Sequence, residues 1–325
     1  MIISRTPLRI TISGGGTDLP SFYEKNEGYV ISLAINKYIY ISLKPDEFEK
    51  NLKLRYSQIE IVNDASELKN HRAKSLLKLH NIDNSIEINT CADLPSNTGL
   101  GSSGSFLVGL SNVIREFKKI NHEPKTLAEE ACDVEINLLK EPVGKQDQYI
   151  AAFGGLKILD ISKNGNVKVK DINISKSKIK KFLSNIHLYY TNVKRDASDI
   201  LKEQKELKGN SEEILKEIKK QSHETVKILE NCNFKEYGLM LDRYWKLKKK
   251  LSNKISLSEI DYIYEIVKKD FEVLGGKIVG AGGGGFLLLF TEKNHVELEN
   301  FMNKNNYQKL EFDIDESGSK IIGNF

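Results

Sequence analysis

Three glycine-rich segments hold the residues of this sequence that are best suited to binding and chemistry. They are Gly14–Asp18, Pro95–Ser105 and Gly280–Gly285. Consecutive glycines let the backbone pass close to a ligand or adopt positive φ angles. The first two segments also carry aspartate, threonine or serine side chains, which bind hydroxyl or phosphate groups. Each segment is therefore a candidate binding loop.

The segment Pro95–Ser105 directly precedes the clearest amphipathic helix pattern of the chain, Phe106–Phe117. The start of a helix presents free N–H groups and the positive end of its dipole, which favour a phosphate. Ser102, Ser103 and Ser105 add hydroxyls for phosphate oxygens or a metal ion. The segment predicts a phosphate-binding loop; the alternative is an N-capping loop that happens to be rich in glycine.

The segment Gly14–Asp18 follows a predicted strand, Leu8–Ser13. Thr17 and Asp18 would then offer hydroxyl-binding groups at the tip of that strand. A turn in which Asp18 caps a short helix, Leu19–Lys25, explains the same residues equally well. Spacing alone leaves both interpretations open.

Two common nucleotide-binding patterns are excluded by their context. Gly99–Gly104 and Gly280–Gly285 both fit G-x-G-x-x-G, but a dinucleotide-binding fold needs a strand before this pattern and a helix after it. Gly280–Gly285 is followed by a strand-like run, and Gly99–Gly104 is preceded by the loop Ala92–Thr98. The P-loop pattern G-x-x-x-x-G-K-[ST] does not occur in the sequence.

The elements that must position these segments predict an α+β protein. Runs rich in β-branched and aromatic residues predict strands through roughly the first 90 residues, and a long helical region follows from Asp196 to Lys269. The early strands include, as separate elements, Ile2–Ser4, Leu8–Ser13, Tyr29–Leu33 and Tyr38–Leu43. A lysine-rich stretch, Ser175–Lys181, is either a domain junction or a solvated helix face. Strands and helices are grouped rather than strictly alternating, which favours α+β.

Composition narrows the class of partner. The 325 residues include 49 basic and 45 acidic side chains, a net charge of +4. A nucleic-acid partner normally requires a concentrated basic face, so none is expected, whereas an anionic small molecule is compatible. The longest apolar run, Phe286–Phe290, is far shorter than the ~20 residues that span a bilayer. Cys91, Cys132 and Cys232 are widely spaced, which favours reduced thiols in the cytoplasm.

The three segments, in this order and at these distances, resemble the motifs of the GHMP kinases. Thr6–Asp18 resembles the first motif in its sugar-kinase form, Pro95–Ser103 the phosphate-binding loop, and Lys277–Gly285 the third motif. The resemblance implies two lobes. Residues 1–180 would form an N-terminal, ATP-binding lobe like domain 2 of ribosomal protein S5, and residues 181–325 a ferredoxin-like C-terminal lobe.

The resemblance also implies roles for individual residues. The expected ATP-binding residues are Pro95, Gly99, Leu100, Gly101, Ser102, Ser103, Gly104 and Ser105. Ser103 and Glu135 would hold Mg²⁺. Asp147 would accept the proton of the sugar's anomeric hydroxyl, and Arg9 would stabilise the charge being transferred. The alternatives are an exposed helical glutamate for Glu135, an N-cap of Gln148–Phe153 for Asp147 and a surface strand residue for Arg9.

Substrate residues are implied in the same way. Gly15, Gly16, Thr17 and Asp18, together with Gly282 and Gly283, would line the sugar site. The opening stretch from Ser4 to Leu43 is most similar to bacterial kinases that phosphorylate O1 of D-glycero-D-manno-heptose 7-phosphate. Galactokinases usually have Gly-Glu-His before the Thr-Asp pair, which argues against galactose. Cationic candidates for the sugar's phosphate are Arg5, Arg55, Lys194 and Arg195, because they lie at strand ends or turns.

The sequence thus predicts an ATP- and Mg²⁺-dependent kinase that makes heptose 1,7-bisphosphate for nucleotide-activated heptose. An L-fucokinase-like or other sugar 1-kinase is the alternative. A nonenzymatic sugar- or nucleotide-sensing relative is a third possibility, but Asp147, Glu135, Ser103 and Arg9 are all present, which argues against it. The expected partner is a small sugar phosphate, without nucleic acid or membrane, and monomer and homodimer both stay open.

Overall fold

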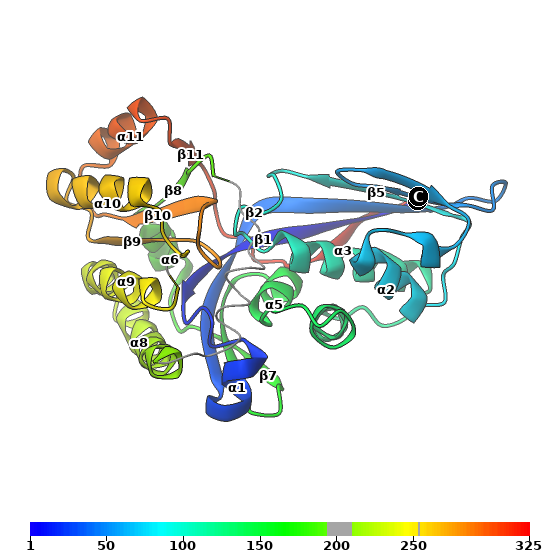
Figure 1. The fold of residues 1–325 in the computed structure, drawn as a ribbon, viewed down its shortest axis with the longest axis horizontal. Helices are drawn as coiled ribbons and strands as arrows, with labels where there is room; N and C mark the ends of the chain where they lie inside the picture. Colours follow the sequence, from blue (N-terminus) through cyan, green and yellow to red (C-terminus); the bar gives the residue numbers. More distant parts are fainter. Residues whose placement is uncertain (194–209, 253) are drawn as a thin grey trace.

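The computed structural model describes residues 1–193, 210–252 and 254–325 and shows two sheets, each with its own helices (Figure 1). The larger sheet has the strand order β12-β1-β2-β5-β3-β4, and β6 and β7 extend it from β2. Its strands are β1 (Ile2–Ser13), β2 (Gly28–Pro45), β3 (Leu52–Arg55), β4 (Ile59–Val62), β5 (Ile86–Ala92), β6 (Leu156–Ile161), β7 (Val167–Asp171) and β12 (Lys320–Asn324). The β3–β5 pair is parallel and the other pairs are antiparallel.

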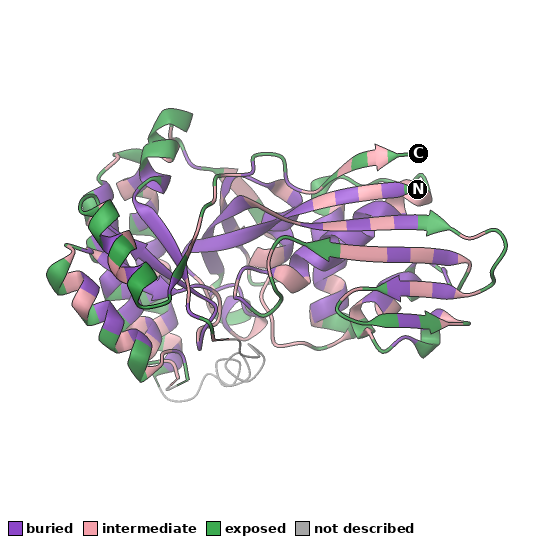
Figure 2. Cartoon of the chain, turned by 90° about the horizontal axis from the view of Figure 1, so that it is seen from above, coloured by how far each residue is buried: buried purple, intermediate pink, exposed green. Residues whose placement is uncertain are grey.

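The two longest strands, β1 and β2, correct the prediction of two short strands in each region. Each is continuous, and the register between them shifts next to Pro7, which cannot donate a ladder hydrogen bond. Along β2, Gly28–Ile35 is buried throughout, whereas the residues after it alternate between buried and more exposed. Figure 2 shows the same change along the sheet. One half of the sheet is therefore covered on both faces and the other half on one.

Helices cover one face of this sheet over its whole length (Figure 1). They are α1 (Pro20–Asn26), α2 (His71–Leu79), α3 (Ser102–Phe117), α4 (Pro124–Cys132) and α5 (Gln146–Phe153), with a 3-10 turn η1 (Ala65–Glu67) and a π-helical stretch η2 (Asp133–Leu138). The α3 helix packs against β1, β2 and α5. Its N-cap is Gly101, with φ of 80°, so the phosphate loop enters α3 through a left-handed turn that favours glycine.

The second sheet has the order β11-β8-β10-β9, and all its pairs are antiparallel. Its strands are β8 (Ile186–Tyr190), β9 (Gly275–Ile278), β10 (Phe286–Phe290) and β11 (Gln308–Leu310), and its helices are α6 (Lys176–Leu183), α8 (Ser211–Glu230), α9 (Phe234–Lys249), α10 (Ser258–Asp270) and α11 (His295–Lys304). Helices separate β8 from β9 and β10 from β11. This is the β-α-β-β-α-β order of a ferredoxin-like lobe, as predicted.

The two lobes are joined at more than one place. The lysine-rich stretch forms most of α6, whose lysines are exposed. The predicted domain boundary at residue 180 falls inside α6. The end of the chain also returns to the first sheet, where β12 pairs with β1. The division into residues 1–180 and 181–325 therefore stays a prediction. A shared core includes buried residues of both sheets, such as Ile10 and Phe290. In the described ranges, no helix has the length and apolar character needed to cross a membrane.

Candidate active site

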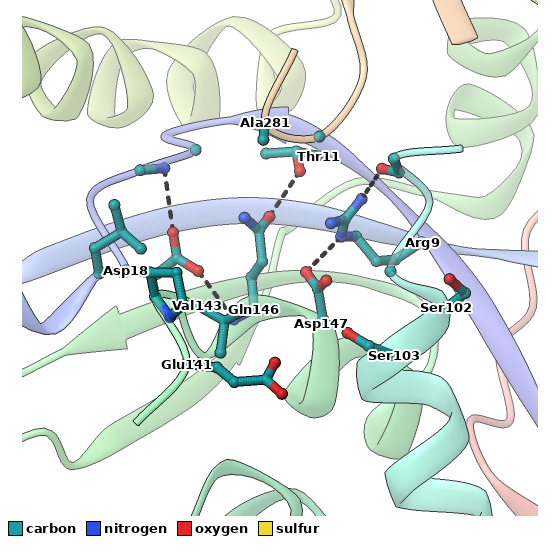
Figure 3. Close-up of a pocket in the computed structure, with 18 of the residues that line it drawn as sticks. Arg9, Thr11, Asp18, Ser102, Ser103, Glu141, Val143, Gln146, Asp147 and Ala281 are labelled. Carbon is teal, nitrogen blue, oxygen red and sulfur yellow. Dashed lines mark hydrogen bonds and ion pairs between the residues drawn. The ribbon is translucent and has the colours of Figure 1, made fainter. Parts of the chain in front are cut away.

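A pocket of about 610 Å³ lies where the two lobes meet. Its walls come from β1, the first glycine segment, the phosphate loop, the segment before α5, and α9 with the third glycine segment (Figure 3). A volume of this size is typical of small-molecule sites. The three segments singled out in the sequence therefore converge on one cavity.

Arg9 and Asp147 form an ion pair inside this pocket. Nε of Arg9 donates to Oδ1 of Asp147 over 2.7 Å, and Nη1 donates to the carbonyl of Gly99 over 2.6 Å. Arg9 is only 4% exposed, so its interpretation as a surface strand residue is wrong. Asp147 lies within the first turn of α5, whose N-cap is Lys145, so it is not an N-cap either. The arginine links the candidate base to the phosphate loop.

Asp18 is buried on the opposite side of Gln146 from this pair. Its carboxylate accepts hydrogen bonds from the backbone N–H groups of Gly16 (3.2 Å) and Gln146 (3.1 Å). Burial raises the pKa of Asp18, and these N–H groups oppose the rise. The N-cap of α1 is Leu19 and makes no side-chain bond, so the capping interpretation of Asp18 is wrong. The side chain of Asp18 lines the pocket, where it can accept hydrogen bonds from substrate hydroxyls.

Gln146 joins the two carboxylates. Its Oε1 accepts hydrogen bonds from the hydroxyls of Thr11 (2.7 Å) and Ser32 (3.1 Å), which fixes the amide at the pocket wall (Figure 3). Its backbone holds Asp18, and Asp147 is the next residue. The order of residues along the start of α5 thus sets the separation of the Asp18 and Asp147 carboxylates.

The phosphate loop lies beside the pair of Arg9 and Asp147. Gly99, Gly101, Ser102 and Ser103 line the pocket. A Cβ on Gly101 would lie 3.1 Å from the Arg9 side chain, and one on Gly104 would lie 2.7 Å from Cβ of Asp147. Glycine at these positions is what lets α3, Arg9 and Asp147 approach one another. The loop therefore forms a cradle open to the pocket.

Four predicted ATP-binding residues, Pro95, Leu100, Gly104 and Ser105, do not line the pocket. Pro95 is exposed, and Leu100 is buried with its carbonyl bound to the N–H of Arg9. The hydroxyl of Ser105 is buried and donates to the carbonyl of Pro7 over 2.8 Å. Leu100 and Ser105 therefore anchor the loop to β1.

Several predicted substrate residues also lie apart from the pocket. Thr17 is buried and its hydroxyl donates to the carbonyl of Gly14 over 2.8 Å, whereas Gly15 and Gly16 line the pocket. Gly282 and Gly283 pack on Ile255, and their neighbours Gly280 and Ala281 line the pocket instead.

Two of the four predicted phosphate-binding cations, Arg5 and Arg55, lie away from the pocket. Arg5 pairs with Asp315 over 3.5 Å and lies over the ring of Tyr38. Arg55 is exposed and pairs with Glu87 over 3.7 Å. Lys194 and Arg195 lie outside the described residues, so their role stays a prediction.

Glu135 is fully buried in η2, so its interpretation as an exposed helical glutamate is wrong. Its carboxylate accepts hydrogen bonds from Nε of Arg72 (2.9 Å) and from Gln148. Burial raises its pKa and Arg72 opposes the rise. Arg72 also pairs with Glu141 at the pocket wall. The role of Glu135 as a metal ligand stays a prediction.

The oxygen donors at the pocket wall fit a hard cation bound together with phosphates. They are the Ser103 hydroxyl and the carboxylates of Asp147 and Glu141, and Mg²⁺ prefers such ligands with substrate phosphate oxygens and water. In the part of the chain that is described, no three His, Cys, Asp or Glu side chains are grouped to hold a metal on their own.

Sequence reasoning missed several pocket residues, among them Gln146 and four basic or aromatic side chains. Arg72 comes from α2, Tyr244 and Lys248 from α9, and Lys277 from β9. Lys277 is 1% exposed and its Nζ donates to the carbonyl of Thr11 over 2.6 Å. The hydroxyl of Tyr244 is buried and has no hydrogen-bond partner in the described residues. Lys277 is the first residue of the third motif, but only glycines of that motif were predicted to line the site. Arg72, Tyr244 and Lys248 lie in helices in which no local pattern separates them from their neighbours.

One interlobe pocket thus holds a glycine-rich loop at a helix N-terminus, an aspartate paired with an arginine, and a second buried carboxylate, an arrangement that fits a small-molecule kinase. Two family profiles match the chain: the GHMP kinases N terminal domain over residues 60–155 and the GHMP kinases C terminal domain over residues 205–308. The chain belongs to the GHMP kinases and is an ATP-dependent phosphotransferase.

Individual relatives place it among sugar kinases of this family. The chain is 29% identical to D-glycero-alpha-D-manno-heptose 7-phosphate kinase of Campylobacter jejuni, over 90% of this chain and 89% of that protein. It is 25% identical to L-fucokinase/L-fucose-1-P guanylyltransferase of Bacteroides fragilis, over 90% of this chain and 35% of that protein. A crystal structure of a D-glycero-D-manno-heptose 1-phosphate kinase from Bacteroides thetaiotaomicron superposes with a TM-score of 0.82 at 20% identity, covering all of both chains.

Proposed function

We propose that this protein transfers the γ-phosphoryl group of ATP to O1 of D-glycero-D-manno-heptose 7-phosphate, giving the 1,7-bisphosphate. The observation that carries the reaction is the Asp147 carboxylate, held by Arg9 between the phosphate loop and Asp18. The similarity to the Campylobacter jejuni kinase over nearly the whole of both chains supports the sugar. The product would supply nucleotide-activated heptose synthesis in the cytoplasm, where ATP is available.

The proposed reaction uses each group at a stated atom. The sugar's O1 attacks the γ-phosphorus, its proton passes to the free carboxylate oxygen of Asp147, and the bond to ADP breaks with its electron pair on ADP. Arg9 orients the carboxylate through Nε and holds the phosphate loop through Nη1. Asp18 accepts hydrogen bonds from the sugar's hydroxyls. Catalysis of phosphoryl transfer is mostly such positioning and charge stabilisation.

Mg²⁺ belongs to the proposal because the pocket supplies oxygen donors beside the phosphate cradle. Ser103 is the first candidate ligand and Glu135 the second, provided that Arg72 releases its carboxylate. When bound, the ion would neutralise charge on the β- and γ-phosphates.

The charge of the pocket favours anionic substrates. Five basic side chains line it, Arg9, Arg72, Lys140, Lys248 and Lys277, against the carboxylates of Asp18, Glu141 and Asp147. The nucleotide needs some of these charges, and a sugar phosphate would use others. A neutral sugar would leave one or more of them without an anion, which costs binding free energy.

The test is a kinetic comparison of heptose 7-phosphate, free heptose, L-fucose and galactose at saturating Mg-ATP. We expect heptose 7-phosphate to exceed each other sugar at least about a hundredfold in kcat/KM, which corresponds to losing one charge-assisted contact of ~2.7 kcal/mol. Product analysis should place the new phosphate on O1. Equal or faster turnover of L-fucose would replace the proposed sugar by the fucokinase alternative. A phosphate elsewhere would overturn the assigned reaction.

A further inference from the structure

Lys248 is a buried cation of the active-site pocket that comes from the C-terminal lobe. It lies near the end of α9, lines the pocket and is 5% exposed. Its Nζ donates a hydrogen bond to the carbonyl of Gly280 in the third glycine segment. An ammonium group has three donors. Donors therefore remain for a ligand in the pocket.

The surroundings of Lys248 do not neutralise it. In the described ranges, no carboxylate lies within ion-pair distance of its Nζ. The charged groups that act on it are Arg9 and Lys277, which oppose its charge, and Asp18, which favours it. Burying a cation without a paired anion is costly. Such a position is explained if an anion enters the pocket and completes the pairing.

The position of Lys248 indicates which anion. Gly280, its acceptor, packs directly on the phosphate loop: a Cβ on Gly280 would lie 2.7 Å from the carbonyl oxygen of Gly99. The same Gly99 carbonyl accepts a hydrogen bond from Arg9, which holds Asp147. Lys248, Gly280, Gly99 and Arg9 thus form a continuous chain of contacts that connects the phosphate loop to Asp147 along the pocket wall.

We propose that Lys248 is a catalytic residue whose ammonium binds the phosphoryl group during transfer. The N-terminal lobe supplies Arg9 and the C-terminal lobe supplies Lys248. As the bond from the γ-phosphorus to ADP breaks and the bond to the acceptor oxygen forms, negative charge stays on the non-bridging oxygens between these two cations. Lys248 keeps its proton, because the acceptor's proton goes to Asp147. The proposal rests on phosphoryl transfer and not on which sugar accepts it.

The experiment compares Lys248→Arg, Lys248→Gln and Lys248→Met with the wild type in steady-state kinetics and ADP binding. Losing one preorganised charge-stabilising donor typically lowers kcat by roughly 10²–10³-fold. We expect that loss in Lys248→Gln and Lys248→Met, with ADP affinity within about threefold of wild type and at least about tenfold recovery in Lys248→Arg. Lys249→Met is the matched control, since the neighbouring side chain faces Asp261 instead.

The glutamine variant distinguishes the effect of the positive charge of Lys248 from that of its hydrogen bond to Gly280. Glutamine can still donate to Gly280 but carries no charge, so a merely structural contact would leave kcat of Lys248→Gln within about threefold of wild type and overturn the proposal. An arginine variant as slow as the methionine variant would also overturn it.

The pH dependence of kcat/KM provides a second test, and it can be measured on the wild type alone. Burial and Arg9 lower the pKa of Lys248 to about 8, so kcat/KM for ATP should fall above about pH 8 as free enzyme loses this charge. The groups facing Lys248 are Arg9 from β1, Asp18 from the first glycine segment, Lys277 from β9 and Tyr244 one turn earlier on α9. Arginine stays protonated, so Lys248→Arg should move this fall to higher pH. An unchanged profile would contradict the proposal.

Discussion

At the scale of single residues, Asp147 is the sharpest test of the reaction. An asparagine in its place would keep an oxygen for Nε of Arg9 and remove the proton acceptor. Asp147→Asn should lower kcat by roughly 10²–10⁴-fold, the usual contribution of a general base, while ADP affinity stays within about threefold. Stopped-flow or steady-state assays with the preferred sugar measure it. A loss below about threefold would remove Asp147 from proton transfer.

Ser103 and Ser105 give a matched pair two residues apart. Ser103 lines the pocket, and Figure 3 shows its hydroxyl directed towards Asp147. Ser103→Ala should lower kcat at least about tenfold with unchanged circular dichroism, because a candidate ligand of the nucleotide's metal and phosphates is lost. Ser105→Ala should keep kcat within about threefold and lose about 1 kcal/mol of stability, since its hydroxyl bonds Pro7. If Ser105→Ala lowered kcat and Ser103→Ala lowered only stability, Ser105 would be the nucleotide-binding residue and Ser103 the structural one.

Residues of the site were predictable where glycine spacing or a resemblance singles them out. Arg9, Asp18, Ser103 and Asp147 lie in such stretches, and the structure brings all four to one pocket. Lys248 was not predictable in this way, because α9 has several lysines and only its packing against β9 decides which one is buried. Arg5 shows the opposite case: it was predicted to bind phosphate because of its place in the chain, but it pairs with Asp315 away from the pocket.

At the scale of elements, the contact between the phosphate loop and the third glycine segment requires glycine on both sides. Gly280 has φ of 77°, and a Cβ there would lie 2.7 Å from the Gly99 carbonyl oxygen. Gly280→Ala should therefore lose about 1–3 kcal/mol of stability from strain and raise KM for ATP at least about tenfold. Gly155→Ala is the control, with φ of 73° but only the flexible Lys157 side chain nearby.

The two alanine variants separate backbone strain from loop contact. If Gly155→Ala raised KM for ATP as much as Gly280→Ala, the interloop contact would not be what positions the nucleotide. Thermal melts report the strain in both variants, and ATP titrations report the contact.

Elements were predicted best where one face of a strand or helix is buried. The second half of β2 alternates as such a strand should. The breaks predicted inside β1 and β2 were wrong because Pro7, and Asn36 with Lys37, resemble turn residues. Both strands continue through these residues. The β1–β2 register shifts beside Pro7, and Asn36 forms hydrogen bonds with Asp313, close to the C-terminal end of the chain. That partner is 277 residues away, which no local pattern reveals.

At the scale of the whole molecule, the buried lysines between the lobes make stability depend on pH. The folded-state pKa of Lys248 is about 8, below its ordinary value of 10.5. Between these values the unfolded chain binds more protons than the folded one, so the free energy of unfolding should rise with pH, by up to about 1.4 kcal/mol per unit. The shared core of Ile10 and Phe290 predicts that both lobes unfold together.

Urea unfolding at pH 7.5, 8.5 and 9.5 would measure this rise, a range that stays below the titration of tyrosines near pH ~10. Lys248→Met should show a smaller rise than the wild type, because the neutral side chain binds no proton in either state. Lys249→Met should keep the wild-type rise, since that side chain is paired with Asp261 near the surface. Parallel curves for wild type and Lys248→Met would show that Lys248 is charged in the folded protein throughout this range. The two lobes would then hold a permanent cation beside Arg9, and the loss of kcat/KM above pH 8 would have to come from another group.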